Sequence, residues 1–197
     1  MSDAAEPIPQ QLLEPLGQAL QFFALFFAGR GSERDWFIQW PAVAQLADEM
    51  IGSRASSLPP PDLKPLEAEK AMAKLFYGVG ETTIPLSESA WFNPQHLSHQ
   101  AQAFEVDAIY RRHDLALDVD ATLPPDHILY ELIFAGTLLR RGESGAAADF
   151  IERHINRWAP LAFDAALKNP ASAAIRPVIL RLLALLERLS ELPKKPA

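Results

Sequence analysis

Residues 173–192, AAIRPVILRLLALLERLSEL, carry apolar side chains three and four positions apart, at Ile175, Ile179, Leu182, Leu186 and Leu189. This spacing places them on one face of an α-helix, because an α-helix repeats every 3.6 residues. Residues 10–29 show the same spacing, at Leu12, Leu13, Leu16, Leu20, Phe23 and Phe27. Both ends of the chain therefore predict helices with an apolar face.

The composition extends this prediction to the whole chain. Leu and Ala supply 59 of the 197 residues, whereas Val, Ile and Thr together supply 20. Leu and Ala favour helices, and β-branched residues favour strands. The length suits one domain with its own core. We expect an all-α, single-domain helical bundle over residues 1–197, with flexible tails at about 1–9 and 193–197.

The apolar periodicity predicts about seven helices. Besides the two terminal ones, the helices are expected at 41–51, 63–77, 94–113, 126–141 and 146–168, and a further short helical piece is expected at 33–40. Pro41 is expected to open a new helix as a first-turn proline. The connectors are expected to be extended at 53–62 (SRASSLPPPD), a loop at 78–93, and an acidic linker at 114–125.

The absence of cysteine excludes disulfides, thiolate zinc sites and cysteine nucleophiles. The first basic residue is Arg30, so the start of the chain lacks the basic region of a secretory signal. The apolar stretch Leu20–Ala28 is about half the ~20 residues needed to span a bilayer. We expect a soluble, cytoplasmic protein without membrane insertion.

The negative charge is concentrated in the middle of the chain. Residues 81–131 hold nine acids and two bases, a net charge of −7 that equals the net charge of the whole protein. No basic stripe is visible, which argues against a nucleic-acid partner. Taken alone, such a segment is more often a solvated face than a docking surface for a cationic partner.

Histidines are the remaining candidates for chemistry. His96, His99 and His113 are the candidate ligands of a small helical metal-dependent enzyme, but zinc sites usually need three or four well-placed ligands, so a solvated face is favoured. His154 falls in an apolar stripe and is expected to be a core histidine that donates to a backbone carbonyl. We expect no cofactor and no metal site.

Two segments carry polar residues that packing does not require. The first runs from Leu75-Phe-Tyr-Gly78 to Ser87-Glu-Ser-Ala-Trp91, and the second is Pro124-Pro-Asp-His127 at the start of an apolar helix. Asp126 is expected in the first helical turn, where ordinary capping explains an acid. His127 is harder to explain, because a cationic ring opposes the helix dipole.

These segments resemble the TorD/DmsD/NarJ family of chaperones for molybdenum-containing oxidoreductases. The resemblance covers about 63–189 and rests on four landmarks in the family's order: Leu75-Phe-Tyr-Gly78; Pro85 with Ser89-Ala-Trp91; Pro125-Asp-His127; and Phe150-Ile-Glu-Arg-His154 with Trp158. Each landmark alone is weak, and their order and separations make the combination specific. One departure is Ser87, where related members commonly carry an aromatic residue.

The resemblance implies an all-helical, non-enzymatic, cytoplasmic chaperone. Its partner would be the apo form of a molybdenum oxidoreductase catalytic subunit, bound through an N-terminal, often twin-arginine, signal peptide until the cofactor is inserted. By position, the resemblance assigns recognition to Ser89, Trp91, Asp126 and His127. Charge and spacing add Glu88 and Glu131, since the acidic segment would meet the arginines of the signal.

Other interpretations stay open at this point. One is the metal-dependent enzyme described above, and another is a helical adaptor for an unrelated partner. The long linker at 114–125 joins helices that could pack within one chain or across two. We therefore expect mainly a monomer, with a minor domain-swapped dimer.

Overall fold

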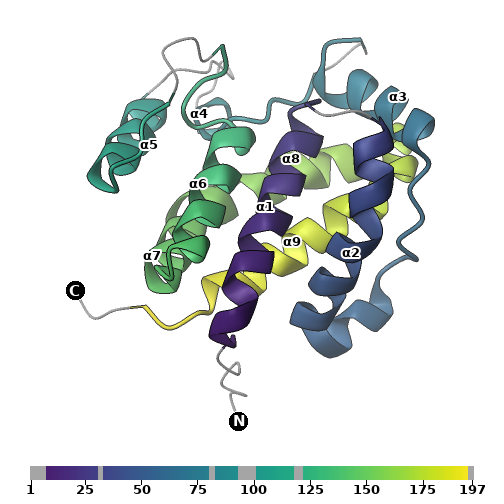
Figure 1. Ribbon diagram of the computed structural model, residues 1–197. Helices are drawn as coiled ribbons and strands as arrows, with labels where there is room; N and C mark the ends of the chain where they lie inside the picture. The colour runs from purple at the N-terminus through teal and green to yellow at the C-terminus, as the bar shows by residue number, and fades with distance from the viewer. Residues whose placement is uncertain (1–7, 31–32, 80–82, 93–100, 118–121, 195–197) are drawn as a thin grey trace.

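A computed structural model describes residues 8–30, 33–79, 83–92, 101–117 and 122–194, and the regular elements within them are all helices (Figure 1). The α-helices of this described part are α1 (Leu13–Phe27), α2 (Glu33–Ile51), α3 (Pro65–Phe76), α4 (Glu88–Trp91), α5 (Ala101–Arg112), α6 (Ile128–Arg140), α7 (Ser144–Phe150), α8 (Asn156–Leu167) and α9 (Arg176–Ser190). The prediction of an all-α fold is confirmed.

α1 lies at the centre of the bundle, with α6 on one side and α2 on the other (Figure 1). Apolar residues cover most of its circumference, and Phe22, Phe23, Phe26 and Phe27 are almost fully buried. The Phe26 ring centroid lies 4.9 Å from that of Trp36 in α2. A helix that is apolar on most sides is stable only when neighbours surround it, which explains why α1 occupies the centre.

Two glycines let α1 and α6 approach until their backbones touch. A Cβ atom on Gly136 would lie 2.7 Å from the carbonyl oxygen of Gly17. A Cβ atom on Gly17 would lie 2.5 Å from the carbonyl oxygen of Gly136. Neither backbone oxygen can move without moving its helix, so this crossing requires glycine on both sides.

The sequence predicted two helices meeting at Pro41, and this prediction is wrong because α2 runs unbroken through that residue. Pro41 cannot donate a hydrogen bond to the carbonyl of Phe37, which normally weakens a helix. Pro41 is exposed, however, while Trp36, Trp40 and Ala44 on another face of α2 are buried. Burial of that face outweighs the lost hydrogen bond.

The connector at 53–62 is only partly extended. Gly52–Ser57 forms a 3₁₀-helix, and the chain becomes extended at Leu58. The hydroxyl groups of Ser56 and Ser57 donate to backbone carbonyls three residues earlier, at 2.8 and 2.7 Å. Short polar side chains favour such local turns. The prolines that follow the serines led to the prediction of an extended connector instead.

The helix predicted at 146–168 is interrupted. A π-helical segment, Ile151–Ile155, separates α7 from α8. A π-bulge re-aims the side chains that follow it and is frequent at functional sites. The predicted loop at 78–93 likewise contains α4, and a 3₁₀-helix at Pro170–Ala174 precedes α9. The tails at 1–7 and 195–197 lie outside the described residues.

An ion pair between a buried arginine and a partly exposed aspartate ties α9 to α2. Arg181 is fully buried, and its Nε and Nη2 atoms lie 2.9 and 3.0 Å from the two carboxylate oxygens of Asp48. Its Nη1 atom donates to the carbonyl of Pro59 at 2.9 Å. The guanidinium therefore fixes the connector after α2 as well as the two helices.

Candidate functional site

The two sequence landmarks around Ser87 and Asp126 meet at one end of the bundle (Figure 1). We call Ser87–Trp91 together with Asp126–Glu131 the α4–α6 junction. The amide of Glu88 donates to the carbonyl of Asp126, and the amide of Ile128 donates to the carbonyl of Leu86, both at 2.9 Å. These bonds form an isolated antiparallel bridge, which holds α4 against the start of α6.

Asp126 caps α4 and not its own helix. Its Oδ2 atom accepts a hydrogen bond from the backbone amide of Ser89 at 2.6 Å, and the residue is fully buried. The expectation of an ordinary cap in its own helix is wrong, because the bridge turns this side chain towards the neighbouring helix.

His127 is the residue that caps α6. Its Nδ1 atom accepts a hydrogen bond from the amide of Leu129 at 3.1 Å. Burial, assisted by the charge of Arg30, lowers the pKa of His127 to about 4. The ring is therefore neutral at pH 7 and serves as an acceptor at the helix N-terminus, so the conflict with the helix dipole disappears.

Glu88 points into the core, where it contacts two groups near the π-helical segment. Its side chain is 1% exposed, and its Oε2 atom lies 3.0 Å from Nδ1 of His154. Its Oε1 atom lies 3.9 Å from the guanidinium of Arg157, which is 57% exposed. Glu88 thus joins α4 to the π-helical segment and α8.

Glu131 is fully buried and receives a hydrogen bond from a neutral donor. The indole Nε1 of Trp158 donates to its Oε2 atom at 2.9 Å. Burial raises the pKa of Glu131 well above its usual value, and the nearby charges of Glu88 and Asp126 raise it further. Desolvation and like charges both disfavour the ionised form of this carboxyl group.

The outer face of the junction is apolar and aromatic. Trp91 is partly buried and donates from Nε1 to the carbonyl of Pro85 at 2.9 Å. Phe92, which follows it, is 38% exposed, and the Arg157 guanidinium lies 4.7 Å from its ring centroid. His127 is also partly exposed. Among the six predicted site residues, only Trp91 and His127 reach the surface; Glu88, Ser89, Asp126 and Glu131 are buried.

Burial of three acids changes the interpretation of the acidic segment at 81–131. Its excess charge was expected to face an arginine pair, but Glu88, Asp126 and Glu131 lie inside the protein. Glu105 and Asp114 are exposed, and residues 81, 118 and 120 lie outside the described part. Three of the nine acids in residues 81–131 are therefore not available to attract a client at the surface.

The family model for the nitrate reductase delta subunit matches residues 41–164. The chain belongs to this family. The nitrate reductase delta family, of which NarJ- and TorD-like chaperones are members, assists molybdoenzyme maturation, and its chaperones bind molybdoenzyme catalytic subunits. Searches of curated proteins and of solved structures gave no match. Within the described residues, no helix of this delta-family chain has the length and apolar character needed to cross a membrane.

Of the three histidines proposed for a metal enzyme, His113 alone lies in the part of this delta-family chain that the structure describes. His113 lies 3.2 Å from Oε2 of Glu143 through its Nδ1 atom and packs edge-on against Phe134. His96 and His99 lie outside the described residues. Among the described ones, no three His, Cys, Asp or Glu side chains are grouped as metal ligands would be.

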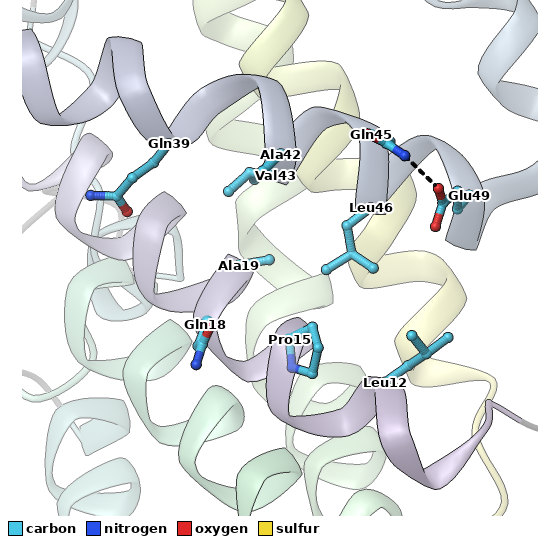
Figure 2. Close-up of a pocket in the computed structure, with 10 residues that line it drawn as sticks. All are labelled: Leu12, Pro15, Gln18, Ala19, Gln39, Ala42, Val43, Gln45, Leu46 and Glu49. Atoms are coloured by element: carbon cyan, nitrogen blue, oxygen red, sulfur yellow. Dashed lines mark hydrogen bonds between the residues drawn. The ribbon is translucent and has the colours of Figure 1, made fainter.

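A separate cleft of about 430 Å³ opens between α1 and α2 (Figure 2). Figure 2 shows an apolar lining with polar side chains at its margin, made by Leu12, Pro15, Ala19, Ala42, Val43, Leu46, Gln18, Gln39, Gln45 and Glu49. The side-chain Nε2 of Gln45 donates a hydrogen bond to Oε1 of Glu49 at 2.9 Å. None of the predicted site residues lines this cleft, and its α1 wall precedes the part matched by the delta-family model.

The sequence analysis did not assign four residues that contact the junction to the site: Tyr110, His154, Arg157 and Trp158. The core position predicted for His154 is confirmed, but its partner is the carboxylate of Glu88, not a backbone carbonyl. The four-residue spacing of His154 and Trp158 was the available signal, since it places both on one helical face. Their partners come from α4 and α6, and local periodicity cannot identify such distant contacts.

Proposed function

We propose that this protein is a cytoplasmic chaperone that binds the N-terminal signal segment of an apo molybdenum oxidoreductase catalytic subunit at the α4–α6 junction. It holds that subunit until cofactor insertion is complete. Family membership supports the chaperone role and the kind of client. The observation that carries the choice of site is the buried polar framework under a partly exposed aromatic surface.

The framework costs folding free energy that a simple packing contact would avoid. Burying a carboxylate costs several kcal/mol unless it is paired, hydrogen-bonded or protonated. Apolar residues of similar volume would join α4 to α6 more cheaply, because backbone hydrogen bonds already connect them. Sequences that break a local rule in this way usually do so at functional sites.

The six predicted residues then divide into two roles. Trp91 and His127 contact the client, together with the neighbouring Phe92. Glu88, Ser89, Asp126 and Glu131 are positioning residues, since their buried side chains fix the backbone that carries Trp91. The apolar stretch of the signal segment is the part that meets this surface, as aromatic side chains supply large contact areas.

The arginine pair of a twin-arginine segment contributes less in this arrangement. Arg157 lies over Phe92 and Arg30 acts on His127, and both cations would repel the arginine pair, whereas the exposed Glu105 lies on α5. Exposed charges attract weakly and are screened over ~8–10 Å near physiological ionic strength. Affinity is therefore expected to fall only modestly with salt.

The test is a calorimetric titration with a synthetic peptide that carries an arginine pair followed by an apolar stretch. Replacing its apolar residues with Asn should weaken binding more than replacing both arginines with Gln. In the protein, Trp91→Ala should lower affinity at least about tenfold, corresponding to ~1.4 kcal/mol. The matched control is Leu66→Ala, which removes an exposed apolar side chain from α3.

The α1–α2 cleft is the alternative binding site for the peptide, and a variant in its lining tests it. Val43→Gln places a polar group in the cleft lining and leaves the junction untouched. If Val43→Gln abolishes peptide binding while Trp91→Ala leaves it unchanged, the client binds in the cleft and the proposed site is wrong. Failure of both the peptide and the purified apo catalytic subunit to bind would overturn the client-binding function.

A further inference from the structure

Three carboxylates from separate segments meet inside the α4–α6 junction: Glu88 from α4, Asp126 from the preceding loop of α6, and Glu131 from α6. We call them the buried acidic cluster. All three lie close enough to Tyr110 of α5 to raise its pKa, although burial is the larger cause. Three buried oxygens here have no hydrogen-bond partner among the described residues: Ser89 Oγ, Asp126 Oδ1 and Glu131 Oε1.

The charges that face the cluster do not balance three ionised carboxylates. From the π-helical segment and α8 come His154 and Arg157, and both contact Glu88. From α5 comes Tyr110, with Asp107 of the same helix adding negative charge near it. From α8, Trp158 offers only a neutral N–H group. One carboxyl group must therefore carry a proton for the cluster to stay buried.

We propose that a single proton held in this cluster keeps the α4–α6 junction closed; this proposal rests on the proposed function. Loss of the proton releases α4 and weakens binding of the client segment. Protonation would then be the regulatory input of the chaperone. Closing depends on the proton because a third negative charge in a dry interior repels the other two. α4 is the element that moves, since it is one turn long and carries both Glu88 and Trp91.

The contacts assign the proton to Glu131. Glu88 has cationic neighbours, and Asp126 accepts a short hydrogen bond from the Ser89 amide. Glu131 contacts no cation; its Oε2 atom accepts from Trp158 and its Oε1 atom has no donor among the described residues. Because Oε2 already accepts from Trp158, Oε1 is the oxygen left to hold the proton, and it then acts as a donor. Its raised pKa agrees with this assignment.

His154 lies between the buried acidic cluster and a second cleft. Its ring contacts Glu88 on one side and lines a polar cleft of about 320 Å³ on the other. The charged and titratable groups around that cleft are Glu105, Arg112, His113, Asp149 and Arg153.

The test compares the wild-type protein with Glu131→Gln from about pH 6 to about pH 9. Gln is uncharged, and its oxygen can still accept from Trp158, so this variant imitates the protonated state. Above the pKa of Glu131, wild-type affinity for the arginine-pair peptide should fall by up to about tenfold per pH unit, because one proton leaves. Glu131→Gln should show a flat profile, and the exposed control Glu67→Gln on α3 should follow the wild type.

The melting temperature without peptide separates the two proposals. It should fall with rising pH in the wild type more than in Glu131→Gln, whether or not the peptide binds. Equal profiles for the two proteins overturn the proton proposal even if the peptide binds well. A proton-dependent melting temperature with no peptide binding at any pH overturns the client-binding function instead.

If Glu131→Gln does not fold, a second variant tests the same assignment of the proton. The Trp158 hydrogen bond favours the ionised form of Glu131. Trp158→Phe removes this bond, which raises the pKa of Glu131 in the folded protein and leaves its pKa in the unfolded chain unchanged. The fall in melting temperature should therefore continue to a higher pH than in the wild type before it levels off. The same end point of the fall in Trp158→Phe and the wild type contradicts the assignment of the proton to Glu131.

Discussion

Asp126 and His127 are neighbours in the chain, yet their side chains cap two different helices, α4 and α6. The sequence indicated that both lie near a helix start, and this part was predictable from Pro124 and Pro125. It could not indicate that Asp126 turns towards Ser89, because the two residues lie 37 positions apart. Whether Asp126 and His127 recognise a client stays a prediction.

The neutral cap at His127 predicts a loss of stability in acid. Its pKa is about 4 in the folded protein and about 6.5 when unfolded. The unfolded chain therefore binds the proton more readily, and stability falls as the pH drops from about 6.5 towards 4. Between pH 6.5 and 5 the loss should reach up to about 2 kcal/mol, at 1.36 kcal/mol per pH unit.

Urea denaturation at a series of pH values measures this effect. His127→Asn keeps a capping side chain and removes the titrating group, so its stability should change less over this range. His127→Ala removes the cap as well and should cost ~1 kcal/mol at pH 7. An acid dependence that is the same in His127→Asn and the wild type would contradict a titrating cap.

For the helices, apolar spacing predicted where each one exists and that it is helical. The residues at which a helix begins and ends depended on packing. The helices around 63–77 and 126–141 were predicted within a few residues of α3 and α6. The predicted break at Pro41 failed because proline weakens a helix without preventing it. The π-helical segment was also missed, since apolar spacing at Phe150, Ile151 and His154 fits either helix type.

Pro41→Ala should stabilise the protein by about 1 kcal/mol or more. The substitution restores a backbone donor to the Phe37 carbonyl and removes a ring from the interior of α2. The matched control is Pro65→Ala, because Pro65 opens α3, where the amide lacks a helical acceptor in any case. Thermal melts of both variants decide the question, and a gain at Pro65 equal to that at Pro41 would contradict this explanation.

The α1–α6 crossing gives a prediction of the opposite sign. Gly136→Ala should destabilise the protein by ~2 kcal/mol or more, because its Cβ would meet the Gly17 carbonyl oxygen. Gly17→Ala should act similarly. Since both substitutions separate the same two helices, the double variant should lose less than the sum of the single losses. Strict additivity in urea denaturation would show that the two clashes are independent.

At the scale of the molecule, composition predicted the helical class, and the charge count did not predict where the charge lies. The Leu and Ala content predicts helices without any information on which residues contact one another. Burial of three acids depends on contacts with α5, α6 and α8 that no local pattern records. The single-domain organisation of 1–197 and the monomer with a minor domain-swapped dimer stay predictions.

The Arg181–Asp48 pair tests how α9 is fastened to α2. Asp48→Ala leaves a buried guanidinium without its carboxylate and should cost ~3–5 kcal/mol. Glu187→Ala breaks the exposed ion pair with Arg54 between the same regions and should cost ~0–1 kcal/mol. Urea denaturation of both variants makes the comparison, and similar losses would mean that burial of Arg181 is irrelevant.

The glycine contact between α1 and α6 also has a consequence for biosynthesis. α1 ends at Phe27, and its packing partner begins at Ile128, about a hundred residues later. At ~5–20 residues per second, the ribosome needs on the order of 5–20 s to supply α6 after α1 has been made. During that interval Trp36 and Trp40 of α2 are available to cover part of α1, but the face of α1 that packs against α6 has no native partner. A member of a chaperone family thus exposes part of its own core while it is being made.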